Sequence, residues 1–103
     1  MSSPSVYELS SKNGSDAVLA AASGTYIVNN TSTYAANPVK AIVVLEDTIF
    51  DSFAHVGNAA NVKTSYIADP ATALKAGAII RPIQSKLFRS IKLTSGSVIL
   101  VLW

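Results

Sequence analysis

The chain has 103 residues, of which half are hydrophobic and only 14% are charged, and its formal net charge is +2. This length corresponds to a single domain, and so small a net charge does not favour nucleic-acid binding. No cysteine is present, which excludes disulfides and thiolate metal sites. The longest apolar run has six residues, far fewer than the ~20 that a membrane helix needs.

Residues 1–23 are predicted to form an N-terminal hairpin or arm. Asn13-Gly14 lies between the strand-like runs 6–11 and 16–21, and Asn-Gly is a strong signal for a hairpin turn. A short helix over 16–22 is the alternative, because this run is rich in alanine. The first five residues lack the basic and apolar regions of a signal peptide, so we expect synthesis in the cytoplasm without a secretion signal.

Three strand-like runs follow. Residues 25–29 are mostly β-branched or aromatic and predict a strand, whereas 30–38 have the composition of a loop. Residues 39–45 form a nearly continuous apolar run, which is typical of a central strand covered on both faces. Residues 48–53 resume the strand pattern after two acidic residues, and a bend or bulge is expected between the two runs.

Those two acidic residues, Glu46 and Asp47, and the single histidine, His55, are the candidates for chemistry. Neighbouring side chains in a strand point to opposite faces, so the two carboxylates are not expected to converge on one ligand. His55 has no second histidine or cysteine to act with it, which favours a surface or half-buried structural role. We therefore expect no catalytic residue, no cofactor and no metal site.

The next segment is predicted to be mostly irregular. Residues 54–62 have loop character. Residues 69–77 predict one or two helical turns, because Asp69 can cap them, a proline follows and Gly77 can close them. Residues 78–83 predict a short strand that Pro82 confines to an edge.

The C-terminal segment is predicted to be a β-hairpin with its turn at Ser95-Gly96. A two-residue loop would place Leu93 opposite Val98, and Phe88 opposite Trp103. Residues 98–103 are all apolar, so both faces of this last strand need cover. A chain this short has little of its own surface to offer, which points to a partner subunit.

Together these runs predict a small all-β domain spanning residues 1–103. We expect a β-sandwich or a rolled antiparallel sheet, with a C-terminal β-hairpin and at most one short helix.

Charge is unevenly distributed: residues 1–51 carry two basic and five acidic side chains, whereas 52–103 carry six basic and one acidic. The basic second half is suited to an acidic partner, although ordinary solvated surface charge is the alternative.

Residues 39–103 contain two segments that resemble a known family. The run 41–50, which includes Val-Leu-Glu-Asp-Thr, and the closing pattern of 76–80 and 88–99 are similar to small structural proteins of tailed bacteriophages, the capsid decoration or cement proteins. The resemblance implies a virion protein, made in the host cytoplasm, on the outer capsid surface. It also implies a homo-oligomer, with a trimer favoured, that binds the major capsid protein and neither nucleic acid nor membrane.

We expect the last strand to lie at or near the subunit interface and the basic half of the chain to face the shell. The candidate interface residues are Phe88, Arg89, Lys92, Ile99, Val101 and Trp103.

Three other functions stay open. A phage head-fibre or tail-tip module that binds host surface glycan would use exposed aromatics, with Tyr26, Tyr34 and Tyr66 as candidates. A cellular β-sandwich binding domain and an enzyme are the remaining alternatives.

Overall fold

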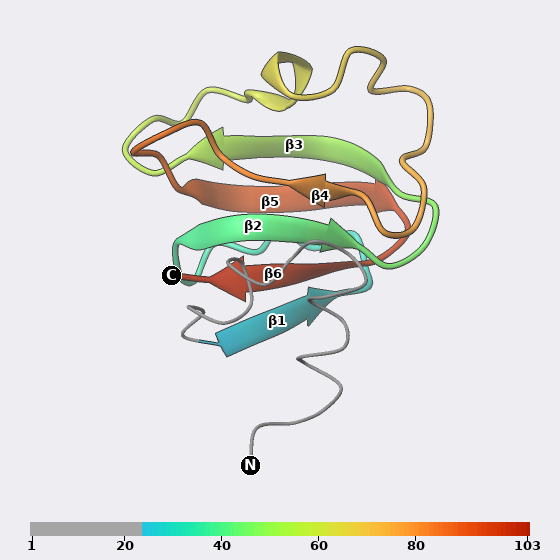
Figure 1. The fold of residues 1–103 in the computed structure, drawn as a ribbon, viewed down its shortest axis with the longest axis horizontal. Coiled ribbons are helices and arrows are strands. Elements are labelled where there is room, and N and C mark those ends of the chain that lie inside the picture. Colours follow the sequence, from blue (N-terminus) through green and yellow to red (C-terminus); the bar gives the residue numbers. More distant parts are fainter. Residues whose placement is uncertain (1–23) are drawn as a thin grey trace.

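The structure is a computed structural model that describes residues 24–103, which form six β-strands and one turn of 3₁₀ helix (Figure 1). The elements are β1 (Gly24–Val28), β2 (Val39–Val44), β3 (Ile49–His55), η1 (Lys63–Ser65), β4 (Ile79–Ile80), β5 (Phe88–Ser95) and β6 (Val98–Leu102). The expected all-β fold is confirmed. The predicted N-terminal hairpin lies outside the described residues.

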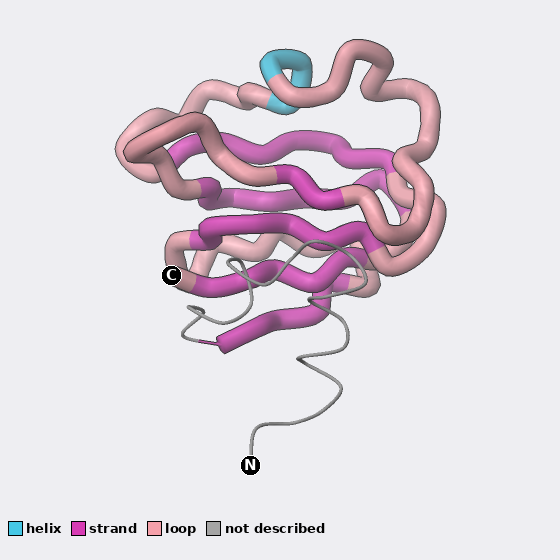
Figure 2. The backbone as a smooth tube through the Cα atoms, viewed as in Figure 1, coloured by secondary structure: helices cyan, strands magenta, loops and turns pink. Residues whose placement is uncertain are grey.

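All six strands belong to one antiparallel sheet with the order β1-β6-β2-β5-β3, and β4 pairs with β2 outside this path (Figures 1 and 2). β2 contacts β6 along one edge. Along its other edge it pairs with β5 at Val39 and with β4 at Ile42 and Val43. The continuous apolar run of β2 was predicted to form a central strand, and this prediction is confirmed.

The sheet is curved around a single main core. Side chains from all six strands meet in one buried cluster, which requires the sheet to bend rather than lie flat. The pairing of β3 with β5 changes register at three points, and Ser90 in β5 has a positive φ of 58°. Bulges of this kind bend a strand and increase its twist, so they account for the curvature.

Aromatic side chains fill one end of the core. Phe53 and Phe88 have no exposed surface, and their ring centroids lie 5.1 Å apart at an edge-to-face angle of 75°. The ring of Tyr66, in the turn after η1, lies 5.1 Å from Phe88 and 5.8 Å from Phe53. Edge-to-face packing of this kind adds about 0.5–1.5 kcal/mol per pair beyond the burial of apolar area.

The predicted C-terminal hairpin is wrong. β5 and β6 are consecutive in the chain, but β6 pairs with β1 and β2, and β5 pairs with β3 and with one residue of β2. The chain therefore crosses from one part of the curved sheet to another at Gly96, and β2 lies between the two strands. As a consequence, β6 is an internal strand with a neighbour from its own chain on each side.

Gly96 makes this crossing possible because the backbone there passes very close to the start of β3. Its φ is +93°, and a Cβ atom at this position would lie 2.5 Å from the carbonyl oxygen of Asp47 and 2.6 Å from Cα of Thr48. Only glycine fits both requirements. The hydroxyl of Thr48, which is fully buried, then accepts a hydrogen bond from the backbone N–H of Ser97 at 3.2 Å and donates one to the carbonyl of Glu46 at 2.8 Å.

The predicted helical turns at 69–77 are also wrong. Asp69 does initiate a turn, in which the N–H of Thr72 donates to the carbonyl of Asp69. Leu74 then pairs with Thr48 through two backbone hydrogen bonds of 3.0 and 2.8 Å, and Gly77 lies in a second turn. A helix of one or two turns has few backbone hydrogen bonds to offer, so pairing with the sheet prevails.

Candidate interaction surface

The six residues predicted to form an interface do not form one patch. Phe88 and Val101 have no exposed surface, so they cannot supply contact area to a partner, and this part of the prediction is wrong. Arg89 is exposed and Lys92 is partly exposed on β5. Ile99 is partly exposed on β6. Trp103 follows β6, and 68% of its surface is exposed.

A second apolar face covers one side of β1, β6 and β2. The strand pairing places Ile27 beside Ile99, Ile99 beside Val43, and Val101 beside Ala41. These five residues, here called the outer face, are separate from the main core, and Ala41, Val43 and Val101 pack together as a second, smaller cluster. Ile27 is 55% exposed. This part of the sheet is therefore apolar on both sides, and on the outer face Ile27, Val43 and Ile99 keep some exposed surface.

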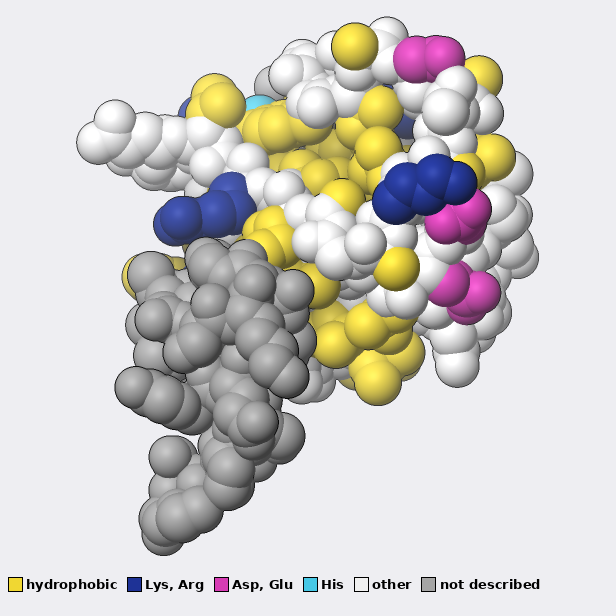
Figure 3. All heavy atoms as spheres, turned by 45° about the vertical axis from the view of Figure 1, so that its right-hand side comes forward, with side chains coloured by type: hydrophobic (Ala, Val, Ile, Leu, Met, Phe, Trp, Pro, Cys, Tyr) yellow, Lys and Arg dark blue, Asp and Glu magenta, His cyan; other side chains and the backbone are white. Residues whose placement is uncertain are grey.

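Other large apolar side chains also reach the surface, and Figure 3 shows hydrophobic side chains gathered across one side of the described part of the molecule. The exposed large hydrophobic residues are Tyr26, Ile27, Leu45, Val56, Ile83 and Trp103. Single exposed apolar residues are common, but apolar residues that adjoin one another on a face indicate a contact surface.

Two of the three tyrosines named for glycan binding lie together. Tyr26 is 52% exposed and its ring centroid lies 4.8 Å from that of Tyr34, which is buried. They border a shallow groove of about 340 Å³ whose polar side chains come from Asn29, Asn30, Ser32 and Thr33. Tyr66 is elsewhere, packed against the aromatic end of the core.

The hydroxyl of Tyr66 holds two segments in place. It lies 2.6 Å from Nε2 of His55 and accepts the backbone N–H of Ile83 at 3.0 Å. The imidazole of His55 is half-buried and stacks on Phe88, with a centroid distance of 5.9 Å and an angle of 14°. His55 is therefore half-buried, which is one of the two positions expected for it.

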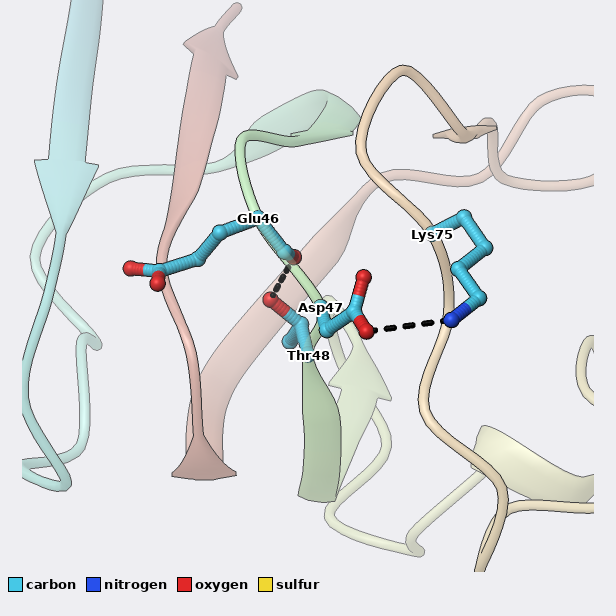
Figure 4. A network of polar contacts seen from close by, with 4 residues as sticks. All are labelled: Glu46, Asp47, Thr48 and Lys75. Carbon is cyan, nitrogen blue, oxygen red and sulfur yellow. Dashed lines mark hydrogen bonds and ion pairs between the residues drawn. The ribbon is translucent and has the colours of Figure 1, made fainter.

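Glu46 and Asp47 point away from each other, as predicted for neighbouring residues of an extended chain (Figure 4). Glu46 accepts a hydrogen bond from the hydroxyl of Ser97 at 2.7 Å, and Asp47 pairs with Lys75 at 3.1 Å. The ion pair is solvent-exposed, so it contributes little to stability. Glu46 therefore connects the loop before β3 to the segment before β6, whereas the contact of Asp47 with Lys75 lies on the surface.

Among the carboxyl groups of residues 24–103, that of Asp69 has a clearly shifted pKa. The hydroxyl of Thr72 donates to Asp69 at 2.6 Å and the N–H of Ala71 donates at 3.2 Å. Both hydrogen bonds favour the ionised form and lower the pKa of Asp69 below its usual value of 3.8. This arrangement belongs to the turn at 69–72 and stabilises it.

Within residues 24–103, no three histidine or acidic side chains gather as metal ligands would, and no helix there is long and apolar enough to cross a membrane. A scan against family models and searches of curated proteins and solved structures return no match to the chain. The described residues offer three surfaces for contact: the outer face, the groove beside Tyr26 and Tyr34, here called the tyrosine groove, and the exposed basic and indole side chains.

Proposed function

We propose that this chain is a structural virion protein that decorates and stabilises a phage capsid as an oligomeric cement protein. The resemblance of residues 39–103 to such proteins suggests the class. The observation that carries the proposal is the outer face, because a sheet that is apolar on both sides is suited to contact with another protein. Such a role needs contact surfaces and no catalytic group.

In this role the exposed part of the outer face, which is Ile27 with the partly exposed Val43 and Ile99, would contact sister copies, with a trimer favoured. Ile27 has the largest exposed fraction on this face, and Ile99 lies beside it in the register of β1 and β6. The basic side chains Arg89 and Lys92 on β5 would face the major capsid protein. Ile27 and Ile99 lie on β1 and β6, and β2 separates these strands from β5 in the sheet, so both contacts can form at once.

Stabilisation would follow from mass action. A protein that binds the mature shell and not its precursor lowers the free energy of the mature form by RT ln(1 + [L]/Kd) at each site. At a concentration 100 times Kd this amounts to about 2.7 kcal/mol per site, and many sites on one shell multiply the effect.

Cosedimentation tests this proposal. Purified chain is mixed with mature particles of the phage whose genome encodes it, and separately with their unexpanded precursors. We expect the chain to pellet with mature particles, and we expect an Arg89→Gln/Lys92→Gln variant to bind more weakly. Lys75→Gln is the control, because it removes an exposed cation from another part of the surface. Absence of the wild-type chain from the particle pellet would reject the proposal.

A head-fibre or tail-tip module that binds host surface glycan is the second candidate, and the tyrosine groove favours it. Exposed Tyr26 beside Tyr34 offers a ring face, and Asn29 and Asn30 offer amide groups within the same groove. Sugars are bound by this combination of an aromatic surface and hydrogen-bonding side chains. A glycan array with reproducible binding that Tyr26→Ala abolishes would support this function over capsid decoration.

A further inference from the structure

A groove of about 290 Å³ lies where three separate segments meet. Lys40 is the second residue of β2, Trp103 follows β6, and residues 81–86 belong to the loop between β4 and β5. Figure 1 shows the start of β2, the tip of this loop and the C-terminus at the same end of the molecule. Sequence reasoning missed the groove because its residues come from three segments, at positions 40, 81–86 and 103, that no local pattern connects.

The groove is strongly basic. Its lining includes Lys40, Arg81 and Lys86 and no acidic residue. In the part of the chain that the structure describes, the one ion pair joins Lys75 to Asp47, so the three cations have no carboxylate partner there. Arg81 and Lys86 are exposed, which leaves their charged ends free to contact a ligand.

Apolar surface lies beside these charges. The indole of Trp103 is 68% exposed and the side chain of Ile83 is 58% exposed, and both line the groove. The ammonium of Lys40 lies 5.9 Å from the centroid of the indole ring, close enough for a cation–π contact. Tryptophan and arginine are the residue types that contribute most to protein binding sites.

The loop that carries Arg81 and Lys86 is held in a defined shape. The N–H of Ile83 donates to the hydroxyl of Tyr66 at 3.0 Å, and the N–H of Lys86 donates to the carbonyl of Ile83 at 3.0 Å. A site whose shape exists before binding loses less conformational entropy when its ligand arrives.

We infer that this groove binds an acidic, extended polypeptide segment, with carboxylates on Arg81 and Lys86 and an apolar side chain against Trp103 and Ile83. Guanidinium groups bind carboxylates through two parallel hydrogen bonds, which gives the contact its geometry. Single-stranded nucleic acid fits less well, because it needs a row of aromatic side chains along a basic track, and this groove offers one indole. The groove would bind such a segment whether or not the chain decorates a capsid.

Fluorescence of Trp103 tests the inference directly, because it is the single tryptophan of the chain. The full chain is titrated with a capped Glu-Asp-Leu-Glu-Asp peptide and with its neutral counterpart, Gln-Asn-Leu-Gln-Asn. We expect the acidic peptide to shift the emission, to bind more weakly as salt rises, and to bind at least about tenfold more tightly than the neutral one.

An Arg81→Gln/Lys86→Gln variant should raise Kd for the acidic peptide about tenfold, since it removes two charge-assisted contacts. The matched control is Arg89→Gln/Lys92→Gln, which removes the same two charges from β5 and should leave Kd unchanged. Circular dichroism of each variant is the check that it is folded. The control variant is also the one expected to weaken particle binding. If the groove inference fails, Arg81→Gln/Lys86→Gln leaves Kd for the acidic peptide unchanged. If the capsid role fails, Arg89→Gln/Lys92→Gln leaves particle binding unchanged.

Four results would overturn the inference: no emission change with the acidic peptide, equal binding of the neutral peptide, equal weakening by the control variant, or tighter binding of a single-stranded oligothymidylate than of the acidic peptide.

Discussion

Replacing Gly96 with alanine should destabilise the chain far more than the same change at Gly77. Both glycines have a φ of +93°, so alanine is strained at each position. At Gly77 nothing lies within 4 Å of the added Cβ, whereas at Gly96 the Cβ would meet the hydroxyl of Thr48 and the carbonyl oxygen of Asp47. The pair of variants therefore separates backbone strain from the close approach of the two segments.

The expected magnitudes follow from this geometry. A non-glycine residue at positive φ costs about 1–2 kcal/mol, which is the whole effect predicted for Gly77→Ala. Gly96→Ala adds an overlap with backbone at 2.5 and 2.6 Å, and relieving it moves Ser97 away from the hydroxyl of Thr48. Losing a buried hydrogen bond costs about 1–3 kcal/mol. Together these two contributions give a total of about 2–5 kcal/mol for Gly96→Ala, with any remaining overlap adding to it.

Urea denaturation followed by circular dichroism measures both variants. A difference of about 2 kcal/mol in the free energy of unfolding corresponds to roughly 10 °C in Tm for a domain of this size, so thermal melts give an independent reading. If Gly96→Ala and Gly77→Ala are equally stable, the backbone at Gly96 is not constrained by Thr48, and the assigned path from β5 to β6 is refuted.

Three further predictions concern hydrogen bonds. Tyr66→Phe should lower the free energy of unfolding by about 1–2 kcal/mol because the N–H of Ile83 and the imidazole of His55 lose their shared partner, and an unchanged urea midpoint would contradict this. Thr48→Val keeps the side-chain shape but leaves the N–H of Ser97 unpaired, so it should cost about 1–3 kcal/mol, with Thr48→Ser, which keeps the hydroxyl, less affected. Thr72→Val should raise the pKa of Asp69 toward its usual value of 3.8, as followed by carboxyl NMR titration. An identical titration of the variant would refute the assigned cause. Because the pKa of Asp69 is lowered in the folded chain, the ionised carboxylate stabilises the fold above pH 3.8. This stabilisation is lost as the pH falls through the pKa of the folded chain.

The strands were predictable from sequence because local patterns define them. The β-branched run at 25–29 and the apolar run at 39–45 correspond to β1 and β2, and the short run ending near Pro82 corresponds to β4. Each of these runs carries its own signal of residue type and period. The 3₁₀ turn at 63–65 was not predicted, since its three residues carry no such signal.

Strand pairing was not predictable in the same way. Ser95-Gly96 is a good hairpin turn by composition, but the decisive contact joins Gly96 to Thr48, which lies 48 positions earlier. In a hairpin, two strands that follow each other in sequence pair with each other. Here β6 pairs with β1 along one edge and with β2 along the other. The need to cover both faces of β6 was recognised, but its own chain supplies more of that cover than was expected.

The candidate surface was predicted only in part for the same reason. The all-apolar run 98–103 does not reveal that Ile99 is partly exposed whereas Val101 has no exposed surface, or that Phe88 packs among other aromatic rings. The basic groove depends on side chains from three segments, and no local pattern brings these together.

The mass of the chain in solution tests the central claim, which is that the outer face associates with sister copies. Sedimentation equilibrium of the wild-type chain should give about three times the chain mass of 10.8 kDa. Ile27→Lys should reduce it to that of one chain, whereas Val56→Lys, an exposed apolar residue outside the outer face, should not. A wild-type mass of 10.8 kDa at every concentration measured would contradict the account.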